Sequence, residues 1–220
     1  MEKERLWSRE YVSLITSQTL TSFGFQMVST VLPLYLLQYG SSESQIGFIM
    51  GSFAFSAFLI RPISPVGIKW IGKKNYLLFG IFITLLAALG YCLTASADNV
   101  LFARISRGLG FGIATTMMAT LVADSIPDSR RGEGIGLFGV ANTIAMSTAP
   151  LFALSIVANN DFSWVFLMSA ASLLTSLVWI KFAFNPKPLY PWLHHYRSFW
   201  CRLCFMGQAW ASCSPPCSPG

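Results

Sequence analysis

The chain has 220 residues, of which 54% are hydrophobic and only 11% are charged, and its net charge is +6. This composition is too apolar for a water-soluble domain, which needs a polar surface. The positive charges are dispersed over short turns instead of forming a basic face with exposed aromatic residues, so the sequence also argues against a nucleic-acid partner.

Six apolar stretches follow one another along the chain, and each has about the 20 residues that an α-helix needs to cross the hydrocarbon of a bilayer. They are too long and too evenly apolar for the strands of a membrane barrel. The first stretch is too long for a secretory signal and lacks a small-residue cleavage site, so we expect it to be retained. The sequence therefore predicts an all-α membrane protein with an N-terminus at residues 1–10, a tail at 185–220, and spans at residues 11–37, 45–64, 76–94, 100–123, 134–157 and 162–184.

The loops between these spans differ in charge. The gaps at residues 38–43, 95–99 and 158–161 contain no Lys or Arg, whereas the alternate gaps and the N-terminus each contain Lys, Arg or both. Short loops rich in Lys and Arg remain in the cytoplasm. We therefore expect a multi-pass protein of the cell membrane with both termini in the cytoplasm, and we attribute the +6 charge to this topology and to contact with the anionic headgroups of the lipid bilayer.

The spans also differ in polar content, which matters because a polar side chain is costly when it faces lipid. The first span is rich in Ser, Thr and Gln, among them Gln18 and Gln26, and the fourth contains Arg104 and Arg107 among several Thr and Gly. We expect spans one and four to line a cavity.

A weak internal repeat indicates two units of three spans. Ile46-Gly47 opens the second span, which reaches Arg61-Pro62, and Ile135-Gly136 opens the fifth, which reaches Ala149-Pro150 at nearly the same distance. The two spans run in opposite directions, as a three-plus-three inverted repeat requires. Chance coincidence of two such dipeptides is the alternative.

Two motifs resemble those of the major facilitator superfamily, and in particular its twelve-span proton-coupled drug and metabolite exporters. Arg61-Pro62-Ile63-Ser64 followed by Gly72-Lys73-Lys74 is similar to the signature loop between spans two and three. Arg104, followed four residues later by Gly108, is similar to the motif of span four. The resemblance covers residues 14–184. It implies the N-terminal half of a secondary transporter that exports a small molecule or drug, with the substrate bound between two halves.

The signature loop departs from the family pattern at two positions, because Pro65 replaces its first Gly and Lys69 replaces its Asp. In the family this Asp helps to latch the cytoplasmic gate, so a Lys inverts the local charge. The resemblance implies a gate formed here by Lys69, Gly72, Lys73, Lys74 and Asp124, in which Lys69 pairs with Asp124. Alternatively, these lysines serve only as topology signals.

Arg104 occupies the motif position that the family associates with proton coupling or with the shape of the cavity. A guanidinium inside a span is costly unless it has partners, and no acidic residue lies inside any of the six spans. Gln18, Gln26 or a group on a second half are the candidate partners. For Arg104 we favour a place in the cavity, whereas for Arg107 we favour snorkelling to the outer membrane surface over a place in the cavity.

The fifth span carries small residues where antiporters of the family have glycines around a Gly-Pro pair. These residues are Ala145, Ala149-Pro150 and Ala153. Small residues four apart allow helices to approach closely, so we expect them to serve helix packing. Asn142 on the same span is expected to form hydrogen bonds between helices.

The sequence contains no enzyme signature, and we expect neither a cofactor nor a metal. Both histidines and four of the five cysteines lie in the tail, in a spacing that fits no common zinc module. The abrupt rise in Trp, Cys and Pro after Pro186 favours out-of-frame translation over an authentic disordered tail.

Three interpretations of the whole chain remain. We favour a half-transporter that binds an unidentified small-molecule substrate together with a second half or a second copy of itself. The alternatives are a non-functional truncated product of an interrupted gene and a six-span protein that assembles with itself as a channel or regulatory subunit.

Overall fold

The fold is that of a computed structural model, which describes residues 7–93, 97–159 and 162–184. The tail, on which the out-of-frame prediction rests, lies outside these residues. Every regular element in the described part is a helix, and six of the helices are long and apolar enough to cross a membrane. These six are α1 (Arg9–Gln38), α2 (Glu43–Ile60), α4 (Lys73–Leu93), α5 (Ala97–Ser125), α6 (Arg131–Asn159) and α7 (Phe162–Ala183).

The first two helices begin where the sequence supplies caps. The Ser8 hydroxyl accepts a hydrogen bond from the Tyr11 backbone N–H and starts α1. Ser42 and Gln45 exchange side-chain and backbone hydrogen bonds at the start of α2, which is a capping box. Between them Gly40 has a φ of 77°, a conformation that favours glycine, so the turn from α1 to α2 is defined locally.

The segment after α2 is more helical than the loop expected from the sequence. A 3₁₀ turn, η1 (Arg61–Ile63), follows α2 and leads into a short helix, α3 (Ser64–Ile71). Pro62 lies at the start of η1, where its missing N–H has little cost. Gly72, with a φ of 85°, ends α3 immediately before α4. The expected gate segment is thus divided between α3 and the first turn of α4.

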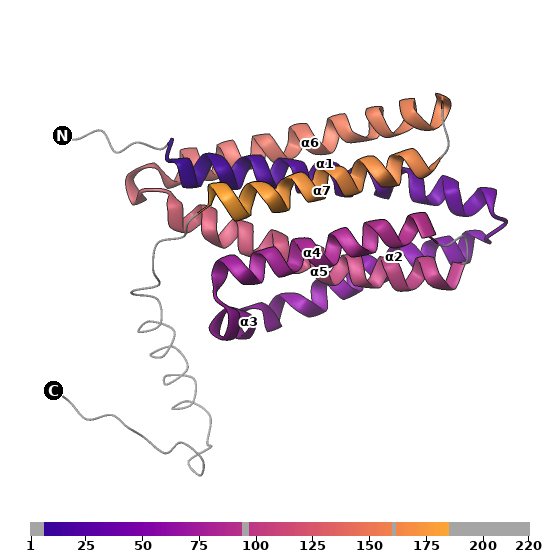
Figure 1. The fold of residues 1–220 in the computed structure, drawn as a ribbon, viewed down its shortest axis with the longest axis horizontal. Helices are drawn as coiled ribbons and strands as arrows, with labels where there is room; N and C mark the ends of the chain where they lie inside the picture. Colours follow the sequence, from indigo (N-terminus) through magenta and orange to yellow (C-terminus); the bar gives the residue numbers. More distant parts are fainter. Residues whose placement is uncertain (1–6, 94–96, 160–161, 185–220) are drawn as a thin grey trace, which may run out of the picture. The chain divides into compact units, whose positions relative to one another are not determined.

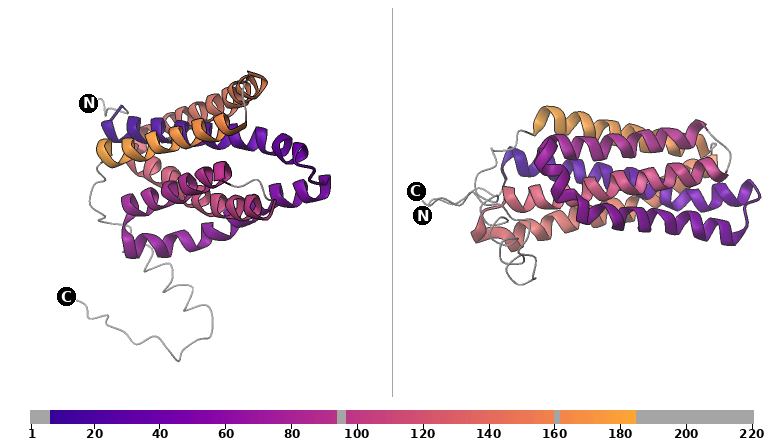
Figure 2. Two further views of the ribbon diagram at one scale, coloured as in Figure 1. Left: turned by 45° about the vertical axis from the view of Figure 1, so that its right-hand side comes forward. Right: turned by 90° about the horizontal axis from the view of Figure 1, so that it is seen from below.

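The six long helices pack as two groups of three. Figure 1 shows α1, α6 and α7 on one side of the bundle and α2, α4 and α5 on the other. Within the groups, α1 packs against α6 and α7, and α5 packs against α2 and α4; α4 also contacts α7 and joins the groups. The two further views in Figure 2 show the long helices running side by side along one direction.

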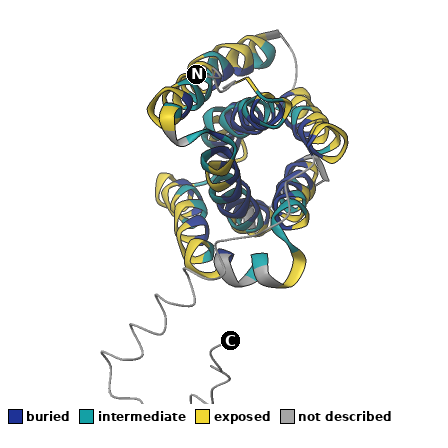
Figure 3. Cartoon of the chain, turned by 90° about the vertical axis from the view of Figure 1, so that its left-hand side faces the viewer, coloured by how far each residue is buried: buried dark blue, intermediate teal, exposed yellow. Residues whose placement is uncertain are grey.

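The helices differ in how much of their surface the bundle covers. Figure 3 shows buried residues on the sides that face other helices and exposed residues on the outside. α1, α4 and α5 are the most covered, and α2 and α6 the least. Phe48, Phe55 and Phe58 on α2 are each at least 67% exposed, and Leu151 on α6 is equally exposed. Apolar surface of this extent is suited to lipid or to further protein.

Glycines on α5 allow its neighbours to approach closely. A Cβ on Gly108 would collide with Ser56 of α2, and one on Gly110 would lie 2.7 Å from the carbonyl oxygen of Gly80 on α4. Because backbones come this near only where side chains are absent, these glycines set the position of α5 between its two neighbours.

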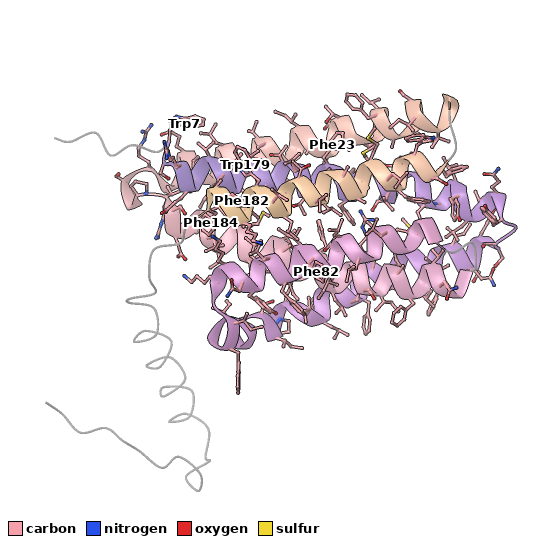
Figure 4. The ribbon with its side chains drawn as sticks, in the orientation of Figure 1. Trp7, Phe23, Phe82, Trp179, Phe182 and Phe184 are labelled. Atoms are coloured by element: carbon pink, nitrogen blue, oxygen red, sulfur yellow. The ribbon has the colours of Figure 1, made fainter. Side chains whose placement is uncertain are left out.

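One end of the bundle carries most of the described basic residues. They are Arg9, Arg61, Lys73, Lys74, Arg130, Arg131 and Lys181. Figure 4 shows Trp7, Trp179 and Phe182 at this same end, where α1 begins and α7 ends. Basic and aromatic side chains are both enriched where a helix leaves the bilayer, so this end fits a membrane interface.

Candidate functional site

Two helices, α1 and α5, each carry a stripe of polar and aromatic residues, and the stripes meet at Arg104–Ser29 and at Phe25–Phe111. Side chains spaced three or four residues apart share one face of a helix. On α1 this face carries polar and aromatic residues, and on α5 it carries two arginines, a phenylalanine and a threonine. The stripes are Gln18, Ser22, Phe25 and Ser29 on α1, and Arg104, Arg107, Phe111 and Thr115 on α5.

Three phenylalanines from three helices meet where these stripes face α2. The ring centroid of Phe25 on α1 lies 4.7 Å from that of Phe53 on α2 and 4.2 Å from that of Phe111 on α5, in both cases with nearly parallel planes. Phe53 and Phe111 are 5.7 Å apart. All three side chains are half-buried. We call these three residues the Phe triad. In the sequence, only the spacing that places Phe111 on the same face of the helix as Arg104 could have indicated it.

Arg104 lies against this triad and has poor hydrogen-bond partners. The residue is only 2% exposed. Both of its terminal nitrogens lie 3.5 Å from the Ser29 hydroxyl, and one lies 3.5 Å from the Met50 sulfur. The Ser29 distances are at the outer limit of a hydrogen bond, the Met50 thioether is a weak acceptor, and Nε has no partner in the structure. The guanidinium carbon lies 4.8 Å from the centre of the Phe53 ring, which favours a cation–π contact.

Arg107 is also buried, but it has short hydrogen bonds. One terminal nitrogen donates to the Gly24 carbonyl of α1 at 2.9 Å and to the Ser169 hydroxyl of α7 at 3.1 Å, while Ser169 itself donates to the same carbonyl at 2.7 Å. The preferred prediction that Arg107 snorkels to the outer surface is therefore wrong. Gly24 has no side chain to cover its carbonyl, and α7 supplies the second acceptor, so the guanidinium finds its partners inside the bundle.

The two glutamines are not among the contacts of Arg104, contrary to the sequence-based expectation. Gln18 donates to Ser22 at 3.0 Å and to Asn142 of α6 at 3.3 Å, and Ser22 donates to Asn142 at 2.5 Å. The expected role of Asn142 between helices thus takes the form of a polar cluster joining α1 to α6. Gln26 is half-buried. Gln18 is too far from Arg104 to contact it, because it lies about 16 Å along α1 from Ser29, the residue of α1 that Arg104 contacts.

Neither buried guanidinium contacts a carboxylate within the described residues. Asp124 lies about 30 Å along α5 from Arg104, and Glu133 follows the turn after Asp124. The side chain of Asp98, at the other end of α5, is outside the described part of the chain. The same residues contain no group of three His, Cys, Asp or Glu that could hold a metal ion. The inward face of this bundle is therefore positively charged and rich in aromatic side chains.

At the basic end, Asp124 pairs with Lys73, whereas the expected pair with Lys69 involves a side chain that the structure does not describe. The Lys73 ammonium lies 2.6 Å from the Asp124 carboxylate, and the side chain of Lys69 is outside the described part of the chain. Lys69 belongs to α3, whereas Lys73 opens α4, which packs directly against α5 and so reaches its end. The Lys74 ammonium donates to the Lys181 carbonyl of α7 at 3.2 Å. Gly72 ends α3 and directly precedes α4.

The small residues of the fifth span lie at the contact of α6 with α1. Ala145, Ala149 and Ala153 are at most 1% exposed, and the last two belong to one apolar cluster with Met27 of α1. Pro150 is half-buried inside α6.

Grooves open on the outer sides of the bundle. One, of about 550 Å³, lies between α2 and α5 and is lined by residues such as Phe55 and Ile105. Another, of about 410 Å³, lies between α4 and α5. Neither of these two grooves is lined by Arg104 or by the Phe triad.

Ionisable side chains buried within apolar helices mark the paths of ions and substrates through membrane transport proteins. The sequence profile of the Major Facilitator Superfamily matches residues 5–212. The chain therefore belongs to this superfamily of membrane transporters, whose members are not enzymes.

Relatives and solved structures agree with this family. An uncharacterised MFS-type transporter of Methanocaldococcus jannaschii is 28% identical over 148 residues, which are 66% of this chain and 38% of that protein. The staphylopine export protein of Staphylococcus aureus is 26% identical over 146 residues, 66% of this chain and 36% of its own. The crystal structure of the POT family transporter PepTSo shares the fold, with a TM-score of 0.74 at 16% identity over 84% of this chain and 40% of that one. The chain spans about a third of the length of these curated relatives.

Proposed function

We propose that this chain is the N-terminal half of a secondary transporter that exports a small molecule. The observation that carries the proposal is the buried Arg104 beside the Phe triad, because a charged group with poor partners inside a membrane bundle belongs to a substrate or ion path. Substrate binds near the bilayer midplane between this half and a second one, and rocking of the halves gives alternating access. The likeness to an export protein supports the outward direction.

We also propose that the six helices form two inverted repeats of three. In the first three, α1 is the leading helix, and in the second three it is α5. Each leading helix packs against the other two helices of the opposite repeat, because α1 contacts α6 and α7 while α5 contacts α2 and α4. This reciprocal exchange supports a pseudo-twofold relation in the membrane plane.

The basic end of the bundle is assigned to the cytoplasm, with both termini on that side of the cell membrane. The support is the gathering of Lys and Arg at this end, opposite Glu43 at the start of α2. A single cysteine at Ser41, in an otherwise cysteine-free chain, is expected to react with an impermeant thiol reagent in intact cells. A cysteine at Ser129 is expected to react only after permeabilisation, and the reverse result would overturn the assignment.

The partner is a second six-helix half or, in its absence, a second copy of this chain. The weakly covered helices α2 and α6 flank the α1 and α5 stripes and offer apolar surface for such a partner. One half cannot close a cavity that two halves build between them.

The proposal is tested in proteoliposomes under an imposed proton gradient. The purified chain alone is expected to show no saturable flux of the test compound, whereas the chain co-reconstituted with the second half of a relative is expected to transport it. Saturable flux by the chain alone contradicts the half-transporter and favours a self-assembling six-span protein. No flux with the second half present, where the same two halves of the relative do transport, favours a non-functional truncated product.

A further inference from the structure

The two buried arginines differ in what they still require, and this difference points to a ligand. A guanidinium carries five N–H donors and no acceptor. Arg107 forms two short hydrogen bonds from one terminal nitrogen, to Gly24 and Ser169, and so ties α5 to α1 and α7, while its other two nitrogens have no partner. Arg104 has contacts of 3.5 Å with Ser29 and Met50, its Nε has no partner, and the buried Tyr91 hydroxyl lies near both guanidinium groups. Arg104 is therefore held in position without being satisfied.

The surroundings of Arg104 define the chemistry of the missing acceptor. The described and undescribed parts of the six spans contain no Asp or Glu, so the spans themselves supply no carboxylate. A carboxylate meets the planar fork of a guanidinium with two parallel hydrogen bonds of ordinary length, far better than a hydroxyl or a thioether at 3.5 Å. A cationic ligand would instead be repelled by both arginines.

The Phe triad defines the remainder of the ligand. Phe53 has the Arg104 guanidinium 4.8 Å from its ring centre and stacks on Phe25, so charge and aromatic surface are adjacent. The three rings are half-buried and keep free surface on which a planar ring can pack edge-on or offset. Met50, flexible and half-buried, covers the guanidinium and can move aside.

We propose that Arg104, Ser29 and the Phe triad form a binding subsite for aromatic organic acids, with the carboxylate on Arg104 and the ring on the triad. This inference rests on the proposed function and names the substrate class of that exporter. Arg107 is a positioning residue for the subsite, because its short hydrogen bonds hold α5 against α1 and its guanidinium carbon lies 5.9 Å from the centre of the Phe25 ring of the triad.

The test is equilibrium dialysis with the full chain in nanodiscs of phosphatidylcholine, which removes anionic headgroups as competitors. Two probes share one ring system and differ in charge: 2-naphthoate and 2-naphthylmethylammonium. Empty discs give the background from partition into lipid. We expect saturable binding of the anion and none of the cation, and saturable binding of the cation with equal affinity would overturn the proposal.

Variants separate the subsite from general charge. Arg104→Gln is expected to weaken 2-naphthoate binding at least about tenfold and Arg104→Lys by less, because an ammonium keeps the charge but loses the fork. Phe53→Leu is expected to weaken binding about fivefold. Arg130→Gln is the matched control, since Arg130 lies at the basic end and pairs with Glu133 at 2.7 Å, and it should bind like the parent.

Each outcome decides one of the two proposals. A monodisperse elution profile and an unchanged melting temperature show that Arg104→Gln is folded. Equal binding by that variant and the parent, or no saturable anion binding at all, overturns the subsite; in the second case Arg104 is left to a carboxylate of the second half. Binding that depends on Arg104 without transport in the two-half assay contradicts the exporter and leaves the subsite standing.

Discussion

Arg104 and Arg107 lie three residues apart on one face of α5, yet the bundle treats them differently. Both are almost completely buried. One terminal nitrogen of Arg107 donates short hydrogen bonds to a backbone carbonyl and a hydroxyl of two other helices, while its other two nitrogens have no partner. Arg104 meets one distant hydroxyl, a sulfur and a ring. Burial by itself therefore does not distinguish an arginine with a structural role from one that binds a ligand. The length of the hydrogen bonds that each arginine forms does distinguish the two roles.

The largest loss of stability is expected from a change at Gly24, whose carbonyl accepts a hydrogen bond from Arg107. In Gly24→Ala the new Cβ would collide with Ser172 and lie 3.0 Å from the Ser169 carbonyl oxygen. Separation of α1 from α7 would also remove the partners of a buried charge, so we expect a loss of about 3 kcal/mol or more of stability. Thermal unfolding of the purified protein in detergent measures it.

The control for that variant is Gly51→Ala, because Gly51 on α2 has nothing within 4 Å of an added Cβ. Alanine has a higher helix propensity than glycine, so the stability of Gly51→Ala should equal or exceed that of the parent. Equal melting temperatures for Gly24→Ala and Gly51→Ala would show that the α1–α7 contact is not close.

Two serine variants measure directly how much the hydrogen bonds of each arginine contribute to stability. Ser169→Ala removes a short acceptor from Arg107 and is expected to cost about 1 to 3 kcal/mol, because a buried charged donor loses its partner. Ser29→Ala removes only contacts of 3.5 Å from Arg104 and is expected to cost less than about 0.5 kcal/mol. Denaturation of the two variants side by side decides the matter. Similar losses would mean that the two arginines are equally well satisfied.

Replacing each arginine by lysine separates a role in transport from a role in stability. In the chain combined with a second half, Arg104→Lys is expected to lower flux about tenfold at normal expression, since an ammonium cannot reproduce the planar fork. Arg107→Lys is expected to reduce mainly the amount of folded protein. Flux at several imposed proton gradients, corrected for the amount in the membrane, measures both. Parent-like flux in Arg104→Lys would remove Arg104 from the transport path.

A small effect is expected at the basic end, away from both arginines. Lys73 and Asp124 form a 2.6 Å ion pair that is partly exposed to solvent. Asp124→Asn is therefore expected to cost no more than about 1 kcal/mol, and added salt should reduce the difference. Melting temperatures at low and high ionic strength test this. A large loss that is insensitive to salt would indicate that the pair is a buried latch.

Much of the fold follows from local properties of the chain. Span length and hydropathy identify six helices because a bilayer demands both within each segment. The motif residues around Arg61 and Arg104 indicate the superfamily, which the profile match then shows. The helix α3 was missed because the sequence between Ser64 and Gly72 resembles a signature loop, although its proline lies at a position that a helix start tolerates.

Sequence alone also determined that two arginines lie within an apolar span with no acidic residue in any of the six, since this is a matter of composition. It could not determine the partners of either one. Those depend on how each helix is rotated about its axis and on which helices pack together, and both depend on contacts between segments far apart in the chain. Only the tertiary structure therefore placed Gly24 and Ser169 against Arg107 and left Arg104 beside Phe53 without a short hydrogen bond.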